Sequence, residues 1–389
     1  MLLQFPTDPA FGLHLKALHS SYLDWITMRR FAELVNAAIF LSVILQLSPA
    51  LLISSIPKQL LPNFTSTGPW KVFQNFTGAH AGDILDGLGN MKKYFQQFGY
   101  IPQGYSDFTD EFDDALEAAI KTYQRNFNLK PTGLLDEATI EQMAKPRCGN
   151  ADIVNSSTSM SSGKTASIFH SVGHYSFFPG QQRWPSDRWN LTYAFYRQES
   201  IPDTAKAVFS RAFQRWAAVT LLTFSETTST ATADIKIGFF VGDHNDGEPF
   251  DGVLGTLAHA FSPTAGMLHL DGDEEWVIEG DVTTSTISTA VDLESVVVHE
   301  IGHVLGLGHS SVENSIMFPT ISSRMRKVDL AADDIQGIQV LYGSNPNYTG
   351  ISSTPTTTDP EREANDCGFR LYGWVPTALL AVGLGVLLP

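Results

Sequence analysis

The fold of this chain is decided by one stretch, His299-Glu300-Ile301-Gly302-His303-Val304-Leu305-Gly306-Leu307-Gly308-His309. His299 and His303 are four residues apart, so on a helix both imidazoles lie on one face and can reach a single metal ion. Gly306 lets the chain leave the helix sharply, because glycine accepts backbone angles that other residues resist. The turn brings His309 round as a third nitrogen ligand.

Glu300 follows the first histidine and cannot easily join the same coordination sphere. It can instead reach a water molecule at the open fourth position of the metal. Zinc lowers the pKa of such a water towards roughly 7, so a carboxylate can take its proton at neutral pH. The alternative is a buried helix with three histidines and no metal, but this spacing arises by chance with a probability of only about 10⁻⁵.

A methionine turn follows at short range in Ser315-Ile316-Met317-Phe318-Pro319, where Met317 is placed to form a hydrophobic base under the metal. The extended histidine motif and this turn resemble those of the metzincins. Ser310, directly after the third histidine, is typical of matrix metalloproteinases. The resemblance covers roughly residues 80–343 and is to plant-type members without a haemopexin domain. It implies an α+β fold, in which a small all-α prodomain precedes a catalytic domain with a twisted mixed sheet and three helices.

The composition excludes some classes of protein. With 389 residues the chain is too long for one comfortable core, so two folded units with terminal segments are expected. A formal net charge of −16 argues against nucleic acid as a partner and suits carboxylates that bind calcium. Cys148 and Cys367 lie far apart in unlike settings, so no disulfide between them is expected and stability must come from the core and from metals.

The N-terminal segment, residues 1–55, is interpreted as an extension with a signal peptide. Residues 1–27 do not resemble a secretion signal, whereas Arg29 and Arg30 precede an apolar run over residues 37–52. Cleavage is expected near residues 50–55, and Met28 is expected to be the true start. An N-terminal membrane anchor is the alternative, although Gln46, Ser48 and Pro49 interrupt the apolar run.

Five N-x-S/T sequons follow the signal peptide and support the secretory route and a glycoprotein. They stand at Asn63, Asn75, Asn155, Asn190 and Asn347. Asn190 begins an alternating, strand-like run, so its side chain is expected to be too enclosed for modification.

Residues 56–173 are interpreted as a propeptide. Apolar residues at helical spacing predict helices over residues 82–98, 112–127 and 136–143, and this unit resembles the peptidoglycan-binding-like prodomain of matrix metalloproteinases. Cys148 follows, and a thiolate is a natural plug for the open position of a zinc site. The segment around it resembles the cysteine switch of the family, which implies that Arg147 pairs with Asp152. A latent zymogen is therefore predicted, with activation cleavage in the Ser/Thr/Gly-rich linker 153–173, shortly before or around His174.

Residues 174–343 are interpreted as the catalytic domain. Strand-like runs occur at residues 190–197, 221–225 and 233–241, and an amphipathic helix is expected over 201–221. The helix that carries the histidine motif is expected to begin near Asp292, a good N-cap, and a closing helix is expected over 330–342. Residues 241–276 are dense in potential ligands and poor in regular secondary-structure pattern.

Two further metal sites are implied in residues 241–276. Three histidines and one aspartate suit a closed tetrahedral zinc site, and in the family the matching residues bind a structural zinc. Oxygen ligands select calcium, of which the resemblance implies at least one. The structural zinc is assigned to His244, Asp246, His259 and His269, and the calcium to Asp251, Gly252, Leu254, Thr256, Asp271 and Glu274.

The C-terminal part, residues 344–389, contains a Thr/Pro-rich tether (344–367) and a hydrophobic tail (368–389). As a helix, the fifteen almost wholly apolar residues from Val375 would span about 22 Å, less than the hydrocarbon core of about 30 Å. A GPI-anchor signal is therefore predicted, which would place the enzyme on the extracellular side of the cell membrane. A helix packed on the domain is the alternative.

Together these features predict a secreted zinc endopeptidase that cleaves extracellular proteins with a zinc-bound water and Glu300 as general base, and that acts as a monomer. Phe318, Pro319 and Thr320 are expected to wall the pocket for the residue after the scissile bond, which should be large and apolar. An adhesion module that has lost catalysis is one alternative, but the presence of Glu300 argues against it. A wall-lytic enzyme is the other, because of the peptidoglycan-binding-like domain.

Overall fold

The computed structural model describes residues 68–155, 157–158, 160 and 175–350, which belong to a unit that ends at Ser352. The signal peptide, Asn63, most of the linker with His174, the tether after residue 350, Cys367 and the tail lie outside the described residues. None of the described helices is both long and apolar enough to span a membrane.

The N-terminal unit is helical, as predicted. It contains a 3₁₀ helix η3 (Pro69–Phe76) and the helices α2 (Leu88–Gln97), α3 (Asp114–Asn126) and α4 (Glu137–Met143). Asp113 and Asp136 cap α3 and α4 by accepting hydrogen bonds from Leu116 N at 2.8 Å and Thr139 N at 3.0 Å.

The start of α2 was predicted six residues too early. Gly82 and Gly87 have φ values of 94° and 96°, which end any helical turn before Leu88.

The core of this unit is aromatic, and it begins at Trp70, before the first helix expected from the sequence. Trp70 and Phe73 of η3 are buried against Tyr94 of α2, with ring centroids 4.9 and 5.5 Å from that of Tyr94. Phe318 of the catalytic part joins the same cluster of buried side chains. The propeptide core and the wall expected for the substrate pocket are therefore packed together.

A six-stranded mixed sheet forms the centre of the catalytic part, as the predicted α+β fold requires. Its strand order is β1-β7-β8-β6-β4-β5, in which β7 and β8 pair antiparallel and all other neighbours pair parallel. The strands are β1 (Arg147–Cys148), β4 (Asn190–Phe195), β5 (Thr223–Glu226), β6 (Ile235–Phe240), β7 (Thr256–Ala260) and β8 (Met267–Asp271). The edge strand β1 comes from the segment that follows the helical unit.

Two-stranded pairings complete the described strands. The strands β9 (Trp276–Val277) and β10 (Val291–Asp292) pair parallel, and β2 (Ile153–Val154) and β3 (Ser157–Thr158) pair antiparallel.

Residues 241–276, whose sequence shows little regular secondary-structure pattern, do contain strands. Strands β7 and β8 and the start of β9 lie in this range. All five residues of β7 are buried, because α6 packs on the strand and the ring of Phe250, from the preceding loop, stacks on that of His259 at 4.9 Å. The alternation of polar and apolar residues that identifies a half-exposed strand is therefore missing.

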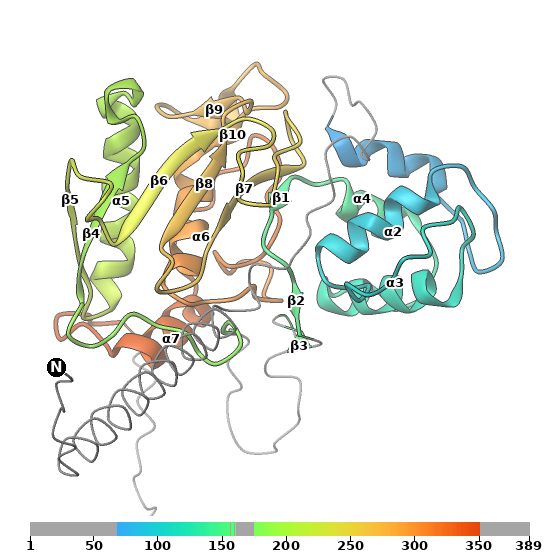
Figure 1. Cartoon of the computed structure of the whole chain (residues 1–389), viewed down its shortest axis with the longest axis horizontal. Coiled ribbons are helices and arrows are strands. Elements are labelled where there is room, and N and C mark those ends of the chain that lie inside the picture. Colours follow the sequence, from blue (N-terminus) through green and yellow to red (C-terminus); the bar gives the residue numbers. More distant parts are fainter. Residues whose placement is uncertain (1–67, 156, 159, 161–174, 351–389) are drawn as a thin grey trace, which may run out of the picture. The chain divides into compact units, whose positions relative to one another are not determined.

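Helices α5 (Asp203–Val219) and α6 (Leu293–Val304) pack together against the sheet and lie behind the strands in Figure 1. Trp216 of α5 donates a hydrogen bond from Nε1 to Val298 O of α6 at 3.0 Å. Every residue of α6 is buried, and Asp292 caps its first turn by accepting from Ser295 N at 2.8 Å, as predicted. The closing helix α7 (Ala332–Tyr342) and the short 3₁₀ helices η4 (Gln198–Ser200) and η5 (Val282–Thr284) complete the fold.

Candidate metal centre and catalytic cleft

His299 and His303 lie on the buried face of α6 with their Nε2 atoms 3.1 Å apart. Their Nδ1 atoms lie 2.7 Å from Ile316 O and 2.8 Å from Leu307 O, so each Nδ1 carries the proton and donates to a carbonyl. Each Nε2 therefore presents a lone pair, and two facing lone pairs at this distance repel each other. A cation bound by both nitrogens would remove that repulsion.

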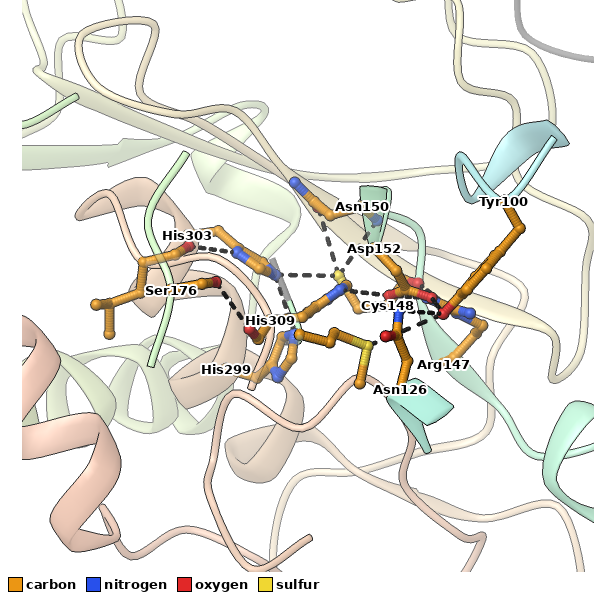
Figure 2. A network of polar contacts seen from close by, with 12 residues as sticks. Tyr100, Asn126, Arg147, Cys148, Asn150, Asp152, Ser176, His299, His303 and His309 are labelled. Carbon is orange, nitrogen blue, oxygen red and sulfur yellow. Dashed lines mark hydrogen bonds and ion pairs between the residues drawn. The ribbon is translucent and has the colours of Figure 1, made fainter. Parts of the chain in front are cut away.

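His309 and Cys148 complete the same cluster (Figure 2). His309 Nε2 is buried without a hydrogen-bond partner among the described residues, and Cys148 Sγ lies 3.4 Å from His303 Nε2. The four candidate ligand atoms all lie within 4.8 Å of one another. Three imidazole nitrogens and one sulfur at these distances fit the closed tetrahedral coordination of zinc.

The turn after α6 requires glycine at position 306. Gly306 has a φ of 106°, and a Cβ at this position would lie 2.2 Å from Gln182 O. The chain can then reverse so that His309 faces the two histidines of the helix, as the sequence predicted.

Glu300 lies beside this cluster but outside the set of four converging ligands. It is fully buried, and neither of its carboxylate oxygens has a hydrogen-bond partner of good geometry within the described residues. Burial raises the pKa of Glu300 to about 8 and raises the pKa of the Cys148 thiol well above its usual value. A bound cation would lower the pKa of both groups.

The predicted pair of Arg147 and Asp152 is present and fully buried, with Arg147 Nη2 2.7 Å from Asp152 Oδ1. The guanidinium stacks over the Phe98 ring at 3.5 Å, and Tyr100 donates a hydrogen bond to Asp152 Oδ2 at 2.8 Å. Burial opposes ionisation of Asp152, but the Arg147 charge and the contact with His309 outweigh it and lower the pKa to about 2.

Asp152 has a second role that sequence reasoning missed. Its Oδ1 lies 2.7 Å from Nδ1 of His309, so this carboxylate accepts a hydrogen bond from the His309 ring (Figure 2). Such an outer hydrogen bond orients an imidazole and makes its other nitrogen a better ligand. Nothing in the spacing of residues 152 and 309 signals this contact, because it depends on how two distant segments dock.

The segment around Cys148 lies between β7 and the methionine turn. Arg147 N donates to Gly255 O at 2.8 Å, and Cys148 N donates to Pro319 O at 2.9 Å. The Asn150 amide pairs with both backbone groups of Ala260, donating at 2.7 Å and accepting at 2.9 Å. Main-chain groups on β7, on the loop before it and in the methionine turn are thus occupied by this segment.

Met317 packs against α6, where it can support the candidate metal site. A Cβ on Gly302, between the two helical histidines, would lie 2.3 Å from Met317 Sδ. The buried carboxylate of Asp334 holds the methionine turn by accepting from Ile316 N at 2.8 Å and Met317 N at 3.2 Å. Asp333 accepts from Ser310 Oγ at 2.6 Å.

A second cluster brings together His244, His259 and His269 around Asp246. Their ring nitrogens lie 2.7, 2.8 and 2.8 Å from the same oxygen, Asp246 Oδ2. The contact of His244 does not have the geometry of a hydrogen bond. Three nitrogens converging on one oxygen exceed its two lone pairs, whereas three His and one Asp around a cation match a structural zinc site.

The predicted oxygen ligands gather in the loop before β7 and at the end of β8. Asp251 Oδ1 accepts from Thr256 N at 3.0 Å, and Asp271 Oδ2 accepts from Gly252 N at 3.1 Å. Leu254 turns this loop with a φ of 63°. Both oxygens of Glu274 are buried without a hydrogen-bond partner among the described residues, and burial raises its pKa to about 9, with Asp271 and Asp251 adding to the effect. Buried carboxylates that repel one another fit a hard cation such as calcium.

A cavity opens beside His299 and Glu300, and the predicted pocket residues Phe318, Pro319 and Thr320 line it. Sequence reasoning had predicted Cys148 as a metal ligand, but it did not assign the remaining lining residues to this pocket, and one of them is a lysine. They are Cys148, Leu257, Ser295, Val296, Ile316, Ile321 and Lys327. No spacing or motif distinguishes this lysine from others in the chain.

The described sequons are accessible. Asn75, Asn155, Asn190 and Asn347 are all exposed. The expectation that Asn190 is enclosed was wrong, because it begins the strand β4 at an exposed position, where its Oδ1 accepts a hydrogen bond from Thr223 at 3.1 Å.

Comparisons with known proteins place these features in a family. Residues 183–343 match the matrixin family model, and residues 86–143 match a putative peptidoglycan binding domain. Metalloendoproteinase 2-MMP of Arabidopsis thaliana is 52% identical over 83% of this chain and 89% of its own length. Metalloendoproteinase 1 of Glycine max is 49% identical over 74% and 93%, and stromelysin-1 of Rattus norvegicus is 33% identical over 72% and 55%.

Proposed function

Because this chain belongs to the matrixin family, as a metalloendopeptidase of the plant matrix metalloproteinase type, we propose that it is made as a latent enzyme with Glu300 as general base. One observation carries the proposal. The Nε2 atoms of His299, His303 and His309 converge beside a buried carboxylate that has no hydrogen-bond partner of good geometry within the described residues. This arrangement leaves Glu300 free to exchange protons with a water molecule at the metal centre.

The reaction is peptide hydrolysis. When bound, zinc polarises the peptide carbonyl and makes water acidic enough to be deprotonated near neutral pH. Glu300 takes a proton from the attacking water and passes it to the leaving amine. His299 and His303 keep their rings oriented through Ile316 O and Leu307 O, so their geometry does not depend on the substrate.

The position of the segment around Cys148 supports latency. The segment Arg147–Cys148 pairs parallel with β7, so it occupies main-chain groups that an extended substrate would need, and Cys148 occupies the fourth ligand position. Further contacts hold the helical unit on the catalytic part, including Asn128 Nδ2 to Ser311 O at 2.7 Å and Gln142 Nε2 to Thr320 Oγ1 at 2.9 Å. The helical unit therefore serves inhibition, although it matches a peptidoglycan-binding family.

Two further cations complete the proposal. His244, Asp246, His259 and His269 would hold a second, structural zinc, and Asp251, Asp271 and Glu274 would hold calcium together with backbone groups of the loop at Gly252, Leu254 and Thr256. The converging ligand atoms support the zinc, and the buried carboxylates support the calcium. Counting metals in the purified protein tests both, with two zinc ions and at least one calcium ion per chain as the expected result.

The cellular setting is inferred from the terminal sequences and the sequons. We propose a secreted glycoprotein that is cleaved near His174 and held on the extracellular side of the membrane by a GPI anchor, where it acts as a monomer on extracellular proteins. N-terminal sequencing of the active protein tests the cleavage. Release from cells by a phosphatidylinositol-specific phospholipase tests the anchor, and failure of release would argue for another form of attachment.

Replacing the proposed general base tests the mechanism. Glu300→Ala should retain zinc and lose peptide cleavage by about 10² to 10⁴-fold or more, because a positioned base contributes that much to the rate. Glu226→Ala, at an exposed position on β5, is the control and should cleave at the wild-type rate. A Glu300→Ala enzyme that binds zinc and cleaves normally would refute the assignment.

A further inference from the structure

The cavity beside the metal centre contains one cationic residue, Lys327, in otherwise largely apolar walls. Leu257, Val296, Ile316, Phe318 and Ile321 line the same cavity. The Nζ of Lys327 lies 5.4 Å from the centroid of the Phe318 ring, so the ammonium group is close to one of these walls. The proposed function accounts for the apolar side chains but not for the lysine.

The main chain of Lys327 is fixed to the helix that carries the metal ligands. Lys327 N donates to Ser295 Oγ in the first turn of α6 at 2.8 Å. The preceding residue, Arg326, pairs with Asp292 at 2.7 Å and with Glu294 at 3.0 Å. Both carboxylates are almost completely buried, so Lys327 is held at a defined distance from His299 and Glu300, which lie on the same helix.

The ammonium group retains capacity for hydrogen bonding. A lysine has three N–H donors, and among the described residues the acceptor found for Nζ is Glu313 O, at 2.8 Å. The remaining donors can reach a group that enters the cavity. In a partly buried site, a hydrogen bond from a charged donor is stronger than one between neutral groups.

We propose that Lys327 determines specificity for the substrate residue after the scissile bond. This inference rests on the proposed endopeptidase function and refines it. In place of the wholly apolar residue expected from the sequence, the pocket takes a long side chain whose stem is apolar and whose end carries an oxygen acceptor, as in glutamine or glutamate. The stem packs against Val296 and Phe318, and the terminal oxygen accepts a hydrogen bond from Lys327 Nζ.

Peptides that differ only in the residue after the scissile bond provide the test. Methionine and glutamine are similar in length, but methionine has only a weak acceptor, so the ratio of kcat/KM for the glutamine peptide to that for the methionine peptide isolates the hydrogen bond. The secreted enzyme is measured after removal of its propeptide. Lys327→Met should lower this ratio about tenfold or more, as expected for the loss of a hydrogen bond from a charged group.

Further variants separate the role of charge from that of packing. Lys327→Arg keeps the cation and should retain the preference for glutamine over methionine. Lys327→Gln removes the cation and should lose the preference for glutamate over methionine, which keeps the test available even if Lys327→Met fails to fold. Lys206→Met, at a lysine paired with the exposed Asp203 on α5, is the matched control and should keep the wild-type ratio.

An unchanged ratio in an active Lys327→Met enzyme would overturn the inference while leaving the proposed function intact. If the wild-type enzyme, loaded with zinc, cleaved none of the peptides, the proposed function would fail and the inference with it.

Discussion

Asparagine in place of Asp152 would keep the shape of the cysteine switch and remove its negative charge. The amide oxygen, in the place of Oδ1, can still accept from His309, which lies 2.7 Å from that atom. The amide nitrogen, in the place of Oδ2, can donate to the Tyr100 hydroxyl, which lies 2.8 Å away. It cannot neutralise Arg147, whose guanidinium is fully buried against the Phe98 ring. The substitution therefore isolates the contribution of one buried ion pair to latency.

The size of the effect follows from the burial. Removing one partner of a buried ion pair costs about 3–5 kcal/mol, because the remaining charge is left without compensation. Each 1.4 kcal/mol changes an equilibrium constant about tenfold. If this cost destabilises the closed state, the population with an open switch should increase by a factor of between roughly 100 and several thousand.

The reactivity of Cys148 reports the open population. In a full-length protein that carries Cys367→Ser, Cys148 is the remaining cysteine, so its rate of modification by a maleimide can be followed directly. Asp152→Asn should raise this rate by at least about 100-fold under native conditions. Peptide cleavage by the unprocessed protein should rise in parallel.

A matched substitution controls for general destabilisation of the propeptide. Asp136→Asn changes another carboxylate of the helical unit, at the N-cap of α4, where it does not contact the switch. Its labelling rate should stay near that of the parent protein, since an asparagine is also a good N-cap. If Asp152→Asn labels within threefold of the parent while remaining folded by circular dichroism, the buried charge pair does not hold the switch closed.

Two other predictions follow from the packing of the metal sites. Gly302→Ala should lower the free energy of unfolding by about 1–3 kcal/mol and reduce zinc content, because its Cβ would lie 2.3 Å from Met317 Sδ. Thermal unfolding and metal analysis check this against Gly104→Ala, where a Cβ meets nothing within 4 Å, and equal stability of the two variants would contradict it. Calcium at 100 times its dissociation constant should stabilise the folded protein by about 2.7 kcal/mol. The melting temperature should respond less to calcium in Glu274→Gln than in the exposed control Glu279→Gln, and a wild-type melting temperature independent of calcium would exclude the site.

Much of the helical structure and of the catalytic centre could be predicted because it depends on short-range spacing. The interval between His299 and His303 matches the period of a helix, and Asp136 and Asp292 act as caps within three residues of the groups they bind. Cys148 was connected to the metal by the affinity of a thiolate for an open zinc position and by its resemblance to a known switch, since no short-range spacing links it to the histidines. The strands β7 and β8 were missed because burial removes the alternating pattern from which strands are recognised.

The sequence by itself determined which residues are able to bind metal, since the types and intervals of the ligands are written in neighbouring positions. Only the tertiary structure decided which nitrogen of each ring faces the centre, that Asp152 also contacts His309, and that Lys327 lines the cavity beside His299 and Glu300. These contacts join residues far apart along the chain, Asp152 and His309 among them. Their partners are selected by the packing of the propeptide, the sheet and α6, and no local pattern of residue types encodes that packing.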